Sequence, residues 1–191
     1  MKEQQKKYEL TDEFIEHWSG KKLYRIRALV TFGSVVVGQL GGFVESEKNL
    51  DQSLLGNAWV FDDAQVFDDA RVYGNAQVSG NAWVFDDARV SGDARVSGDA
   101  RVYGDASVRS YAIISDKKMI FLASNVGSEN GTLTVFNGKG GLIVTRGCFT
   151  GTVDEFLSKS AKVHDDKTRN EYKLLIEVAK SRILGVKNER N

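Results

Sequence analysis

A six-residue repeat in the middle of the chain restricts the possible folds more than any other feature. From Ala58 to Ala112 an alanine recurs at every sixth position. Two positions after each alanine stands a valine, from Val60 to Val108, and finally Ile114. The ten units of Ala-x-Val are separated by turn residues such as Ser-Gly-Asp or Phe-Asp-Asp. This period and its glycines exclude an α-helix, and the strands are too short for ordinary hairpins.

The repeat also predicts which side chains face the interior. In a short strand, Ala and Val two positions apart point to one side, and the residue between them points to the other. A core of Ala and Val requires close approach of the backbone. Gly and Asp alternate at the second turn position, as at Gly74 and Asp86, so a positive φ or a tight bend is expected there. We therefore expect a narrow apolar core with turns at its corners.

This pattern resembles the hexapeptide repeat of left-handed parallel β-helices. In that fold three hexads form a coil of about 18 residues, and coils stack about 4.8 Å apart. LYRIRALVTFGSVVVGQLGGFVESEKNL before the repeat and GCFTGTVDEF after it are similar to short hexapeptide-repeat proteins of phages and prophages and to YdcK-like bacterial relatives. The resemblance covers roughly residues 20–160. It implies a left-handed β-helix, and the transferase label that such proteins often carry rests on fold alone.

The chain is interpreted as mainly β, with a cap at each end of the β-helix. Caps are needed because a short solenoid exposes unpaired backbone groups and an apolar cross-section at both ends. The predicted parts are an N-terminal helical segment (1–20), an N-terminal β cap (21–56), a β-helix of about three coils (57–115) and a C-terminal α+β cap (116–191).

Local signals predict the elements of the two caps. Thr11 is a suitable N-cap for a helix over Asp12–Trp18 that Gly20 would end. Alternating apolar residues from Tyr24 to Ala28 predict a strand. In the C-terminal cap, MIFLAS, GTLTVF and GLIVTR are predicted strands. A capping box at residues 152–155 starts one predicted helix, and a second helix is expected from about 168 to 184.

The composition excludes several classes of protein. The 26 Lys and Arg balance the 26 Asp and Glu, so neither a nucleic-acid-coating surface nor an acidic nucleic-acid mimic is expected. The single cysteine cannot close an internal disulfide. No apolar run suits a membrane span or a signal peptide. We therefore expect a cytoplasmic protein, located in the host bacterial cytoplasm if it is phage-encoded.

Signals for catalysis are weak. Acyltransferases of the fold that this sequence resembles use a histidine as general base, placed between neighbouring subunits. No hexad contains a histidine, so His17 and His164 are the remaining candidates, and Cys148 is a weak candidate nucleophile. A packed or solvated structural role is the alternative for all three. No cofactor is predicted.

Aspartates recur at the turns, and three hexads per coil would stack them in columns. One column would hold Asp68, Asp86 and Gly104, and the neighbouring column Asp69, Asp87 and Asp105. Asn75 and Asn81 occupy equivalent hexad positions without a charge. Hydrogen bonds from each Asp to its own turn therefore explain the position better than metal binding does, and no metal site is predicted.

The outward residues give three further columns. These are Trp59, Gln77, Arg95 and Ile113; Gln65, Trp83 and Arg101; and Arg71, Arg89 and Ser107. A ladder of exposed aromatic side chains with arginine is typical of an interface, although a cap of the same chain is the alternative cover. The predicted interface residues are Phe67, Trp83, Phe85, Arg101 and Tyr103. Arg71 and Arg89 are predicted to bind an anionic group.

Two function classes stay open. The first is a non-catalytic binding protein of phage or prophage type that self-associates, and a homotrimer is the favoured assembly. It would engage a host protein or a small anionic ligand and thereby counteract a host defence system. The second is an acyltransferase-like enzyme whose base lies outside the repeat, at His17 or His164. The absence of a histidine from the hexads favours the first class.

Overall fold

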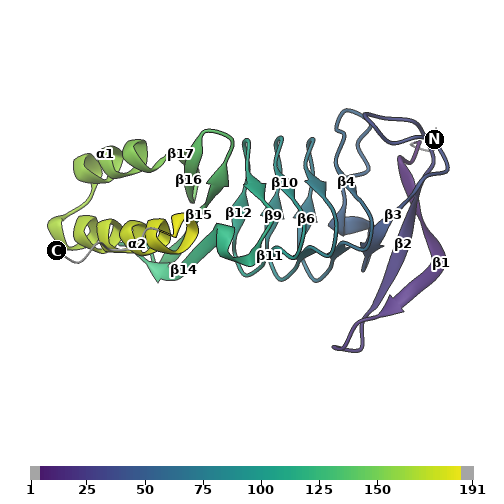
Figure 1. Cartoon of the computed structure of the whole chain (residues 1–191), viewed down its shortest axis with the longest axis horizontal. Helices are drawn as coiled ribbons and strands as arrows, with labels where there is room; N and C mark the ends of the chain where they lie inside the picture. Colours follow the sequence, from purple (N-terminus) through teal and green to yellow (C-terminus); the bar gives the residue numbers. More distant parts are fainter. Residues whose placement is uncertain (1–4, 186–191) are drawn as a thin grey trace.

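The computed structural model describes residues 5–185, which form a rod (Figure 1). A hairpin lies at the N-terminal end, a parallel solenoid forms the middle, and an antiparallel sheet with two helices forms the C-terminal end. The predicted segments 1–20 and 116–191 extend past the described residues at 1–4 and 186–191. None of the described helices is long and apolar enough to cross a membrane.

The solenoid consists of short parallel strands that form three sheets. Its strands are β3 (Leu40–Val44), β4 (Trp59–Val60), β5 (Gln65–Val66), β6 (Arg71–Val72), β7 (Gln77–Val78), β8 (Trp83–Val84), β9 (Arg89–Val90), β10 (Arg95–Val96), β11 (Arg101–Val102), β12 (Ser107–Val108) and β13 (Ile113–Ile114). One side is ordered β3-β5-β8-β11, the second β4-β7-β10-β13, and the third β6-β9-β12. This confirms the predicted mainly β solenoid. Its left-handed winding stays a prediction.

Strand pairing confirms all three outward columns and adds a coil. Trp83 pairs with Gln65 and Arg101, and Arg89 pairs with Arg71 and Ser107. In the remaining column, Gln77 and Arg95 are neighbours. The pairings β3 with β5 and Leu50 with Val72 place an irregular coil before the first hexad. The solenoid therefore has four coils and begins ahead of the predicted residue 57, because residues without the hexad pattern can still pair with it.

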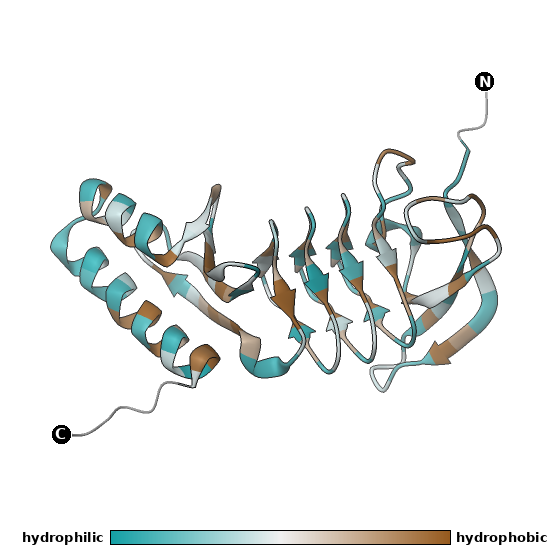
Figure 2. Ribbon diagram, turned by 45° about the horizontal axis from the view of Figure 1, so that its top comes forward, coloured by the Kyte–Doolittle hydropathy of each residue, from teal (hydrophilic) through white to brown (hydrophobic). Residues whose placement is uncertain are grey.

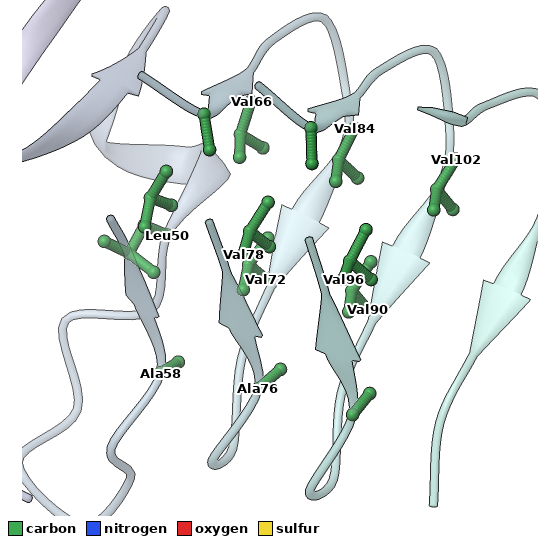
Figure 3. Close-up of a cluster of buried hydrophobic side chains, with 14 of the residues drawn as sticks. Leu50, Ala58, Val66, Val72, Ala76, Val78, Val84, Val90, Val96 and Val102 are labelled. Carbon is green, nitrogen blue, oxygen red and sulfur yellow. The ribbon is translucent and has the colours of Figure 1, made fainter. Parts of the chain in front are cut away.

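The core of the solenoid is the predicted stack of alanine and valine. Every Ala of the hexads is at most 1% exposed, as is every Val. Val66, Val84 and Val102 form one column in the interior, and Val78 and Val96 lie across from them (Figure 3). Figure 2 shows that hydrophilic and hydrophobic residues alternate within the short strands along the rod. Because the interior holds only small side chains, it has no room for a larger ring.

The corners confirm the expected backbone conformation but correct the hydrogen bonding. Asp68 and Asp86 have φ of 59° and 58°, and Gly74 at an equivalent position has φ of 70°. The Asp carboxylates do not bond to their own turns. Oδ2 of Asp86 accepts a 3.0 Å hydrogen bond from N–H of Gly104, which is one coil further along. A corner aspartate of one coil thus accepts a hydrogen bond from a backbone N–H of the next coil.

The N-terminal segment is a hairpin, so the helix predicted over Asp12–Trp18 is wrong. Strand β1 (Tyr8–Glu16) pairs antiparallel with β2 (Lys22–Ala28), and β2 extends the sheet through β3. Gly20, with φ of 83°, lies in the hairpin turn rather than at a helix end. Glu13 forms an ion pair with Arg25 across the two strands. The pairing of β1 with β2 therefore outweighs the weak local signal for a helix.

Residues at the start of β1 close the open end of the solenoid. The Lys7 side chain is fully buried, and its Nζ donates to the carbonyl oxygens of Gly56 and Ala58 at 3.4 and 3.1 Å. The Tyr8 hydroxyl donates to the carbonyl oxygen of Leu50 at 2.7 Å. These contacts satisfy carbonyls that no preceding coil can pair. A short 3-10 helix, Glu47–Asn49, lies in the same coil.

The C-terminal cap confirms the three predicted strands and adds a fourth. Its sheet is ordered β14 (Ile120–Val126), β15 (Gly131–Gly138), β16 (Gly141–Arg146) and β17 (Phe149–Thr152). A 3-10 helix, Lys117–Met119, precedes the sheet. Helices α1 (Val153–Val163) and α2 (Asp166–Leu184) follow it. The predicted capping box is present, since Thr152 and Glu155 exchange hydrogen bonds.

The cap closes the other end of the solenoid through both apolar and polar contacts. Ile120 and Phe136 belong to the same buried cluster as the Ala and Val stack. Oγ1 of Thr145 donates to the Ser107 carbonyl oxygen at 2.6 Å. Nδ2 of Asn137 donates to the carbonyl oxygen of Ile113 at 3.1 Å. The cap and the last coil are therefore one continuous packed unit.

Candidate functional site

The sheet β3-β5-β8-β11 carries a column of aromatic rings on its outer side. The rings of Phe67 and Phe85 are stacked, with centroids 5.2 Å apart and planes at 6°. The Tyr103 ring continues the stack 5.5 Å from Phe85. Beside them the Arg101 guanidinium lies 4.1 Å from the centroid of the Trp83 ring. The structure thus brings all five predicted interface residues onto one side of the solenoid.

The N-terminal hairpin covers one end of this column. His17 lies 4.7 Å from Phe67 and 5.2 Å from Trp83, measured between ring centroids. As a result Phe67 is only 4% exposed, which corrects its expected place on an open surface. Trp83 and Phe85 are half-buried, whereas Tyr103 is 44% exposed. The alternative that a cap of the same chain covers the aromatic rings therefore holds fully for Phe67 and in part for Trp83.

Trp59, which the sequence also places on the outside, is fully buried. Its indole packs against Tyr8 and Phe32, with ring centroids 6.0 and 5.4 Å away. The sequence gives no signal for this cover, because Phe32 lies in a loop outside the repeat. Trp59 therefore closes the solenoid and does not belong to a binding surface.

Trp18, in the turn of the N-terminal hairpin, extends the aromatic column. Its ring lies 5.1 Å from His17, and its side chain is 83% exposed. We call Trp18, Phe67, Trp83, Phe85 and Tyr103 the aromatic strip. Trp18 is absent from the predicted interface because it was expected at the end of a helix, whereas it lies in the hairpin turn.

The other end of the aromatic strip opens into a groove. Arg101 and Tyr103 form one wall of this groove, and Leu174 and Val178 of α2 form the other. Its volume is about 1060 Å³. Leu174 and Val178 are 59% and 54% exposed, because the opposite side of α2 packs on the C-terminal sheet. Lys117, Glu177 and Arg182 also line the groove, so apolar and charged side chains share the surface between the aromatic strip and α2.

A second hollow lies between the third side of the solenoid and the C-terminal sheet. Arg89 lines it together with Arg109 and Arg146, and its volume is about 480 Å³. Asp87 and Asp105 also line this hollow, which we call the arginine cleft. Arg71, the other predicted anion-binding residue, is the register neighbour of Arg89 but is not part of the lining. Arg109 and Arg146 are not predictable from the repeat, because only tertiary packing brings them to the same cleft.

The three candidate catalytic residues lie in different settings. His17 is 6% exposed among aromatic rings, and this burial lowers the pKa of its imidazole. Its Nδ1 is 2.8 Å from Oγ of Ser19. Cys148 is exposed, and it lines a cavity of about 200 Å³ together with His164. Within residues 5–185 no hydrogen bond joins Cys148 and His164, so the cavity is not a formed nucleophile–base pair.

Comparison with known families agrees with the repeat architecture. A family model described as the YdcK beta solenoid repeat matches residues 64–80, 76–92, 88–104 and 94–111. All four windows lie between β4 and β13, where the hexads follow one another without interruption. The protein is therefore a β-solenoid repeat protein, and residues 64–111 of its solenoid are similar to the YdcK beta solenoid repeat. No curated protein matches the chain.

Proposed function

We propose that the protein is a non-catalytic interaction protein that self-associates through the aromatic strip. The observation that carries this proposal is the row of aromatic side chains on one side of the solenoid, from Trp18, 83% exposed, to Tyr103, 44% exposed. Monomeric soluble proteins rarely leave large contiguous apolar patches open to water. Aromatic side chains beside arginine are typical of the centre of a protein interface.

Charge supports a second copy of the chain as the partner. Arg101 lies over Trp83 beside the strip. Burial lowers the pKa of its guanidinium, and the nearby Asp99 opposes this lowering. Asp86 flanks the same side of the solenoid and is exposed. A surface that presents both an arginine and a carboxylate can pair with its own copy.

The expected assembly is a homotrimer. The side that bears the strip is built from short parallel strands, and three such sides packed about an axis would hide a repeated patch completely. Covering the half-exposed rings would contribute on the order of several kcal/mol at about 25 cal/mol per Å², before association costs are subtracted.

Light scattering coupled to size exclusion tests self-association directly. At micromolar concentration the wild-type protein should elute with about three times the mass of one chain. Trp18→Ser should shift the mass toward one chain without loss of fold, because Trp18 is 83% exposed. The double variant Trp83→Ser and Phe85→Ser should do the same. Ile113→Ser is the matched control, since Ile113 is 41% exposed on a different side of the solenoid.

A wild-type mass of one chain would contradict the proposed function. An acyltransferase would behave differently, and acetyl-CoA distinguishes the two. For a non-catalytic protein, acetyl-CoA should not raise the melting temperature, and His17→Ala and His164→Ala should not change any acyl-transfer signal. A saturable rise together with thioester consumption that either variant removes would favour the enzyme.

A further inference from the structure

We propose that the arginine cleft binds a phosphorylated sugar, with the phosphate group held by Arg89, Arg109 and Arg146. The cleft lies on the side formed by β6, β9 and β12, away from the sheet that bears the aromatic strip. The proposal is therefore independent of self-association.

Three separate elements bring the arginines together. Arg89 begins β9, Arg109 follows β12, and Arg146 ends β16. None of the three forms an ion pair within 4.0 Å in the described part of the chain. Each of these guanidinium groups therefore lacks a carboxylate within 4.0 Å among the described residues, and its positive charge would attract an anion in the cleft.

Two of the guanidinium groups are held in place by the backbone. Nη2 of Arg109 donates to the Gly147 carbonyl oxygen at 2.7 Å, and Nη2 of Arg146 donates to that of Val126 at 3.3 Å. The Nε atoms of Arg109 and Arg146 are buried and have no hydrogen-bond partner among residues 5–185. These anchored side chains lose little further freedom when they bind.

The frame around the cleft is rigid and shaped for Arg146. Thr145, next to Arg146, is 1% exposed and its hydroxyl donates to the Ser107 carbonyl oxygen. The Arg146 side chain lies over Gly131, where an added Cβ would be 2.5 Å from Cζ of the guanidinium. Gly131 therefore leaves the space that the guanidinium occupies.

The other lining residues point to the rest of the ligand. Guanidinium groups donate paired hydrogen bonds to phosphate oxygens. Asp87 and Asp105 carry negative charge into the same cleft, so a compact polyanion would be repelled by them. Carboxylates accept hydrogen bonds from hydroxyl groups, and a sugar supplies these. A volume of about 480 Å³ suits a molecule of this size.

Isothermal titration calorimetry with ribose 5-phosphate tests the site. We expect saturable binding that is at least about tenfold tighter than that of inorganic phosphate, and no binding of ribose at the same concentrations. Arg109→Gln and Arg146→Gln should each weaken binding by about tenfold or more, since each removes a charged donor. Arg95→Gln is the matched control, because Arg95 is an exposed solenoid arginine on another side.

Two further variants separate the site from general effects of charge or folding. Gly131→Ala keeps every charge but displaces the Arg146 guanidinium, so it should weaken ribose 5-phosphate binding even if Arg146→Gln does not fold. Asp105→Asn should reduce the preference for ribose 5-phosphate over inorganic phosphate. The proposal is overturned by absence of binding at millimolar ligand, by equal binding of inorganic phosphate and the sugar phosphate, or by equal effects of Arg146→Gln and Arg95→Gln.

Discussion

The imidazole ring of His17 lies on the phenyl ring of Phe67, with ring centroids 4.7 Å apart. His17 belongs to the turn of the N-terminal hairpin, and Phe67 belongs to the second coil of the solenoid. This contact attaches the hairpin to the aromatic strip. It also buries Phe67, whereas Tyr103 stays accessible. Substitutions of these two rings should therefore have different effects.

Replacing Phe67 should affect stability rather than assembly. Phe67 is 4% exposed beneath the hairpin, so Phe67→Ala should lower the free energy of unfolding by about 3 kcal/mol or more. Tyr103→Ser should cost much less, because Tyr103 is 44% exposed. Chemical denaturation of both variants measures the difference. An equal, small effect of the two substitutions would contradict the packing of Phe67 under His17.

The burial of His17 predicts a dependence of stability on pH. Burial lowers the pKa of the folded imidazole, and the lowering by Lys21 is opposed by Asp68. The unfolded chain therefore binds a proton more readily, and stability is lost as pH falls below about 6.5, the ordinary histidine value. His17→Phe keeps a ring against Phe67 and removes the titration. As the pH falls from 7.5 to 5.5, wild type should lose more free energy of unfolding than this variant. Denaturation at each pH measures the difference.

The interior of the solenoid should reject charge and bulk. Val84 and Ala88 are fully buried in the central coils. Val84→Asp places a carboxylate where no partner is available, and Ala88→Trp places a large ring in a core of small side chains. Both should abolish cooperative thermal unfolding. Arg89→Gln, at an exposed neighbouring position, should leave the melting temperature almost unchanged.

The hydrogen bond from the Gly104 N–H to the Asp86 carboxylate should stabilise the stacking of one coil on the next. Asp86→Ala removes the acceptor for the Gly104 N–H and leaves an Ala at φ of 58°, so it should cost about 1–3 kcal/mol. Asp86→Asn keeps an acceptor and tolerates this φ, so it should cost little. Asp86→Gly relieves the backbone strain but not the lost bond, and it should lie between them. Thermal denaturation that failed to rank Ala as the least stable would contradict this account.

The candidate sites were predictable only in part. The positions of Trp83, Phe85, Arg101 and Tyr103 on one side follow from counting 18 residues per coil, because stacking preserves the spacing of a repeat. Trp18 was not predictable by that count, since it lies outside the repeat. The arginine cleft was not predictable either, because Arg146 lines the same hollow as Arg89 only once the C-terminal sheet packs on the solenoid.

The sequence by itself determined the solenoid, its Ala and Val core, and the three outward columns. Each of these depends on φ, ψ and spacing within one hexad, so repetition is enough to specify it. Only the tertiary structure decided which outward side chains are covered. Trp59 and Phe67 occupy outward positions, yet both are buried because Tyr8 and His17 reach them from the N-terminal hairpin. Burial of this kind depends on contacts between residues far apart in the chain, which local periodicity does not encode.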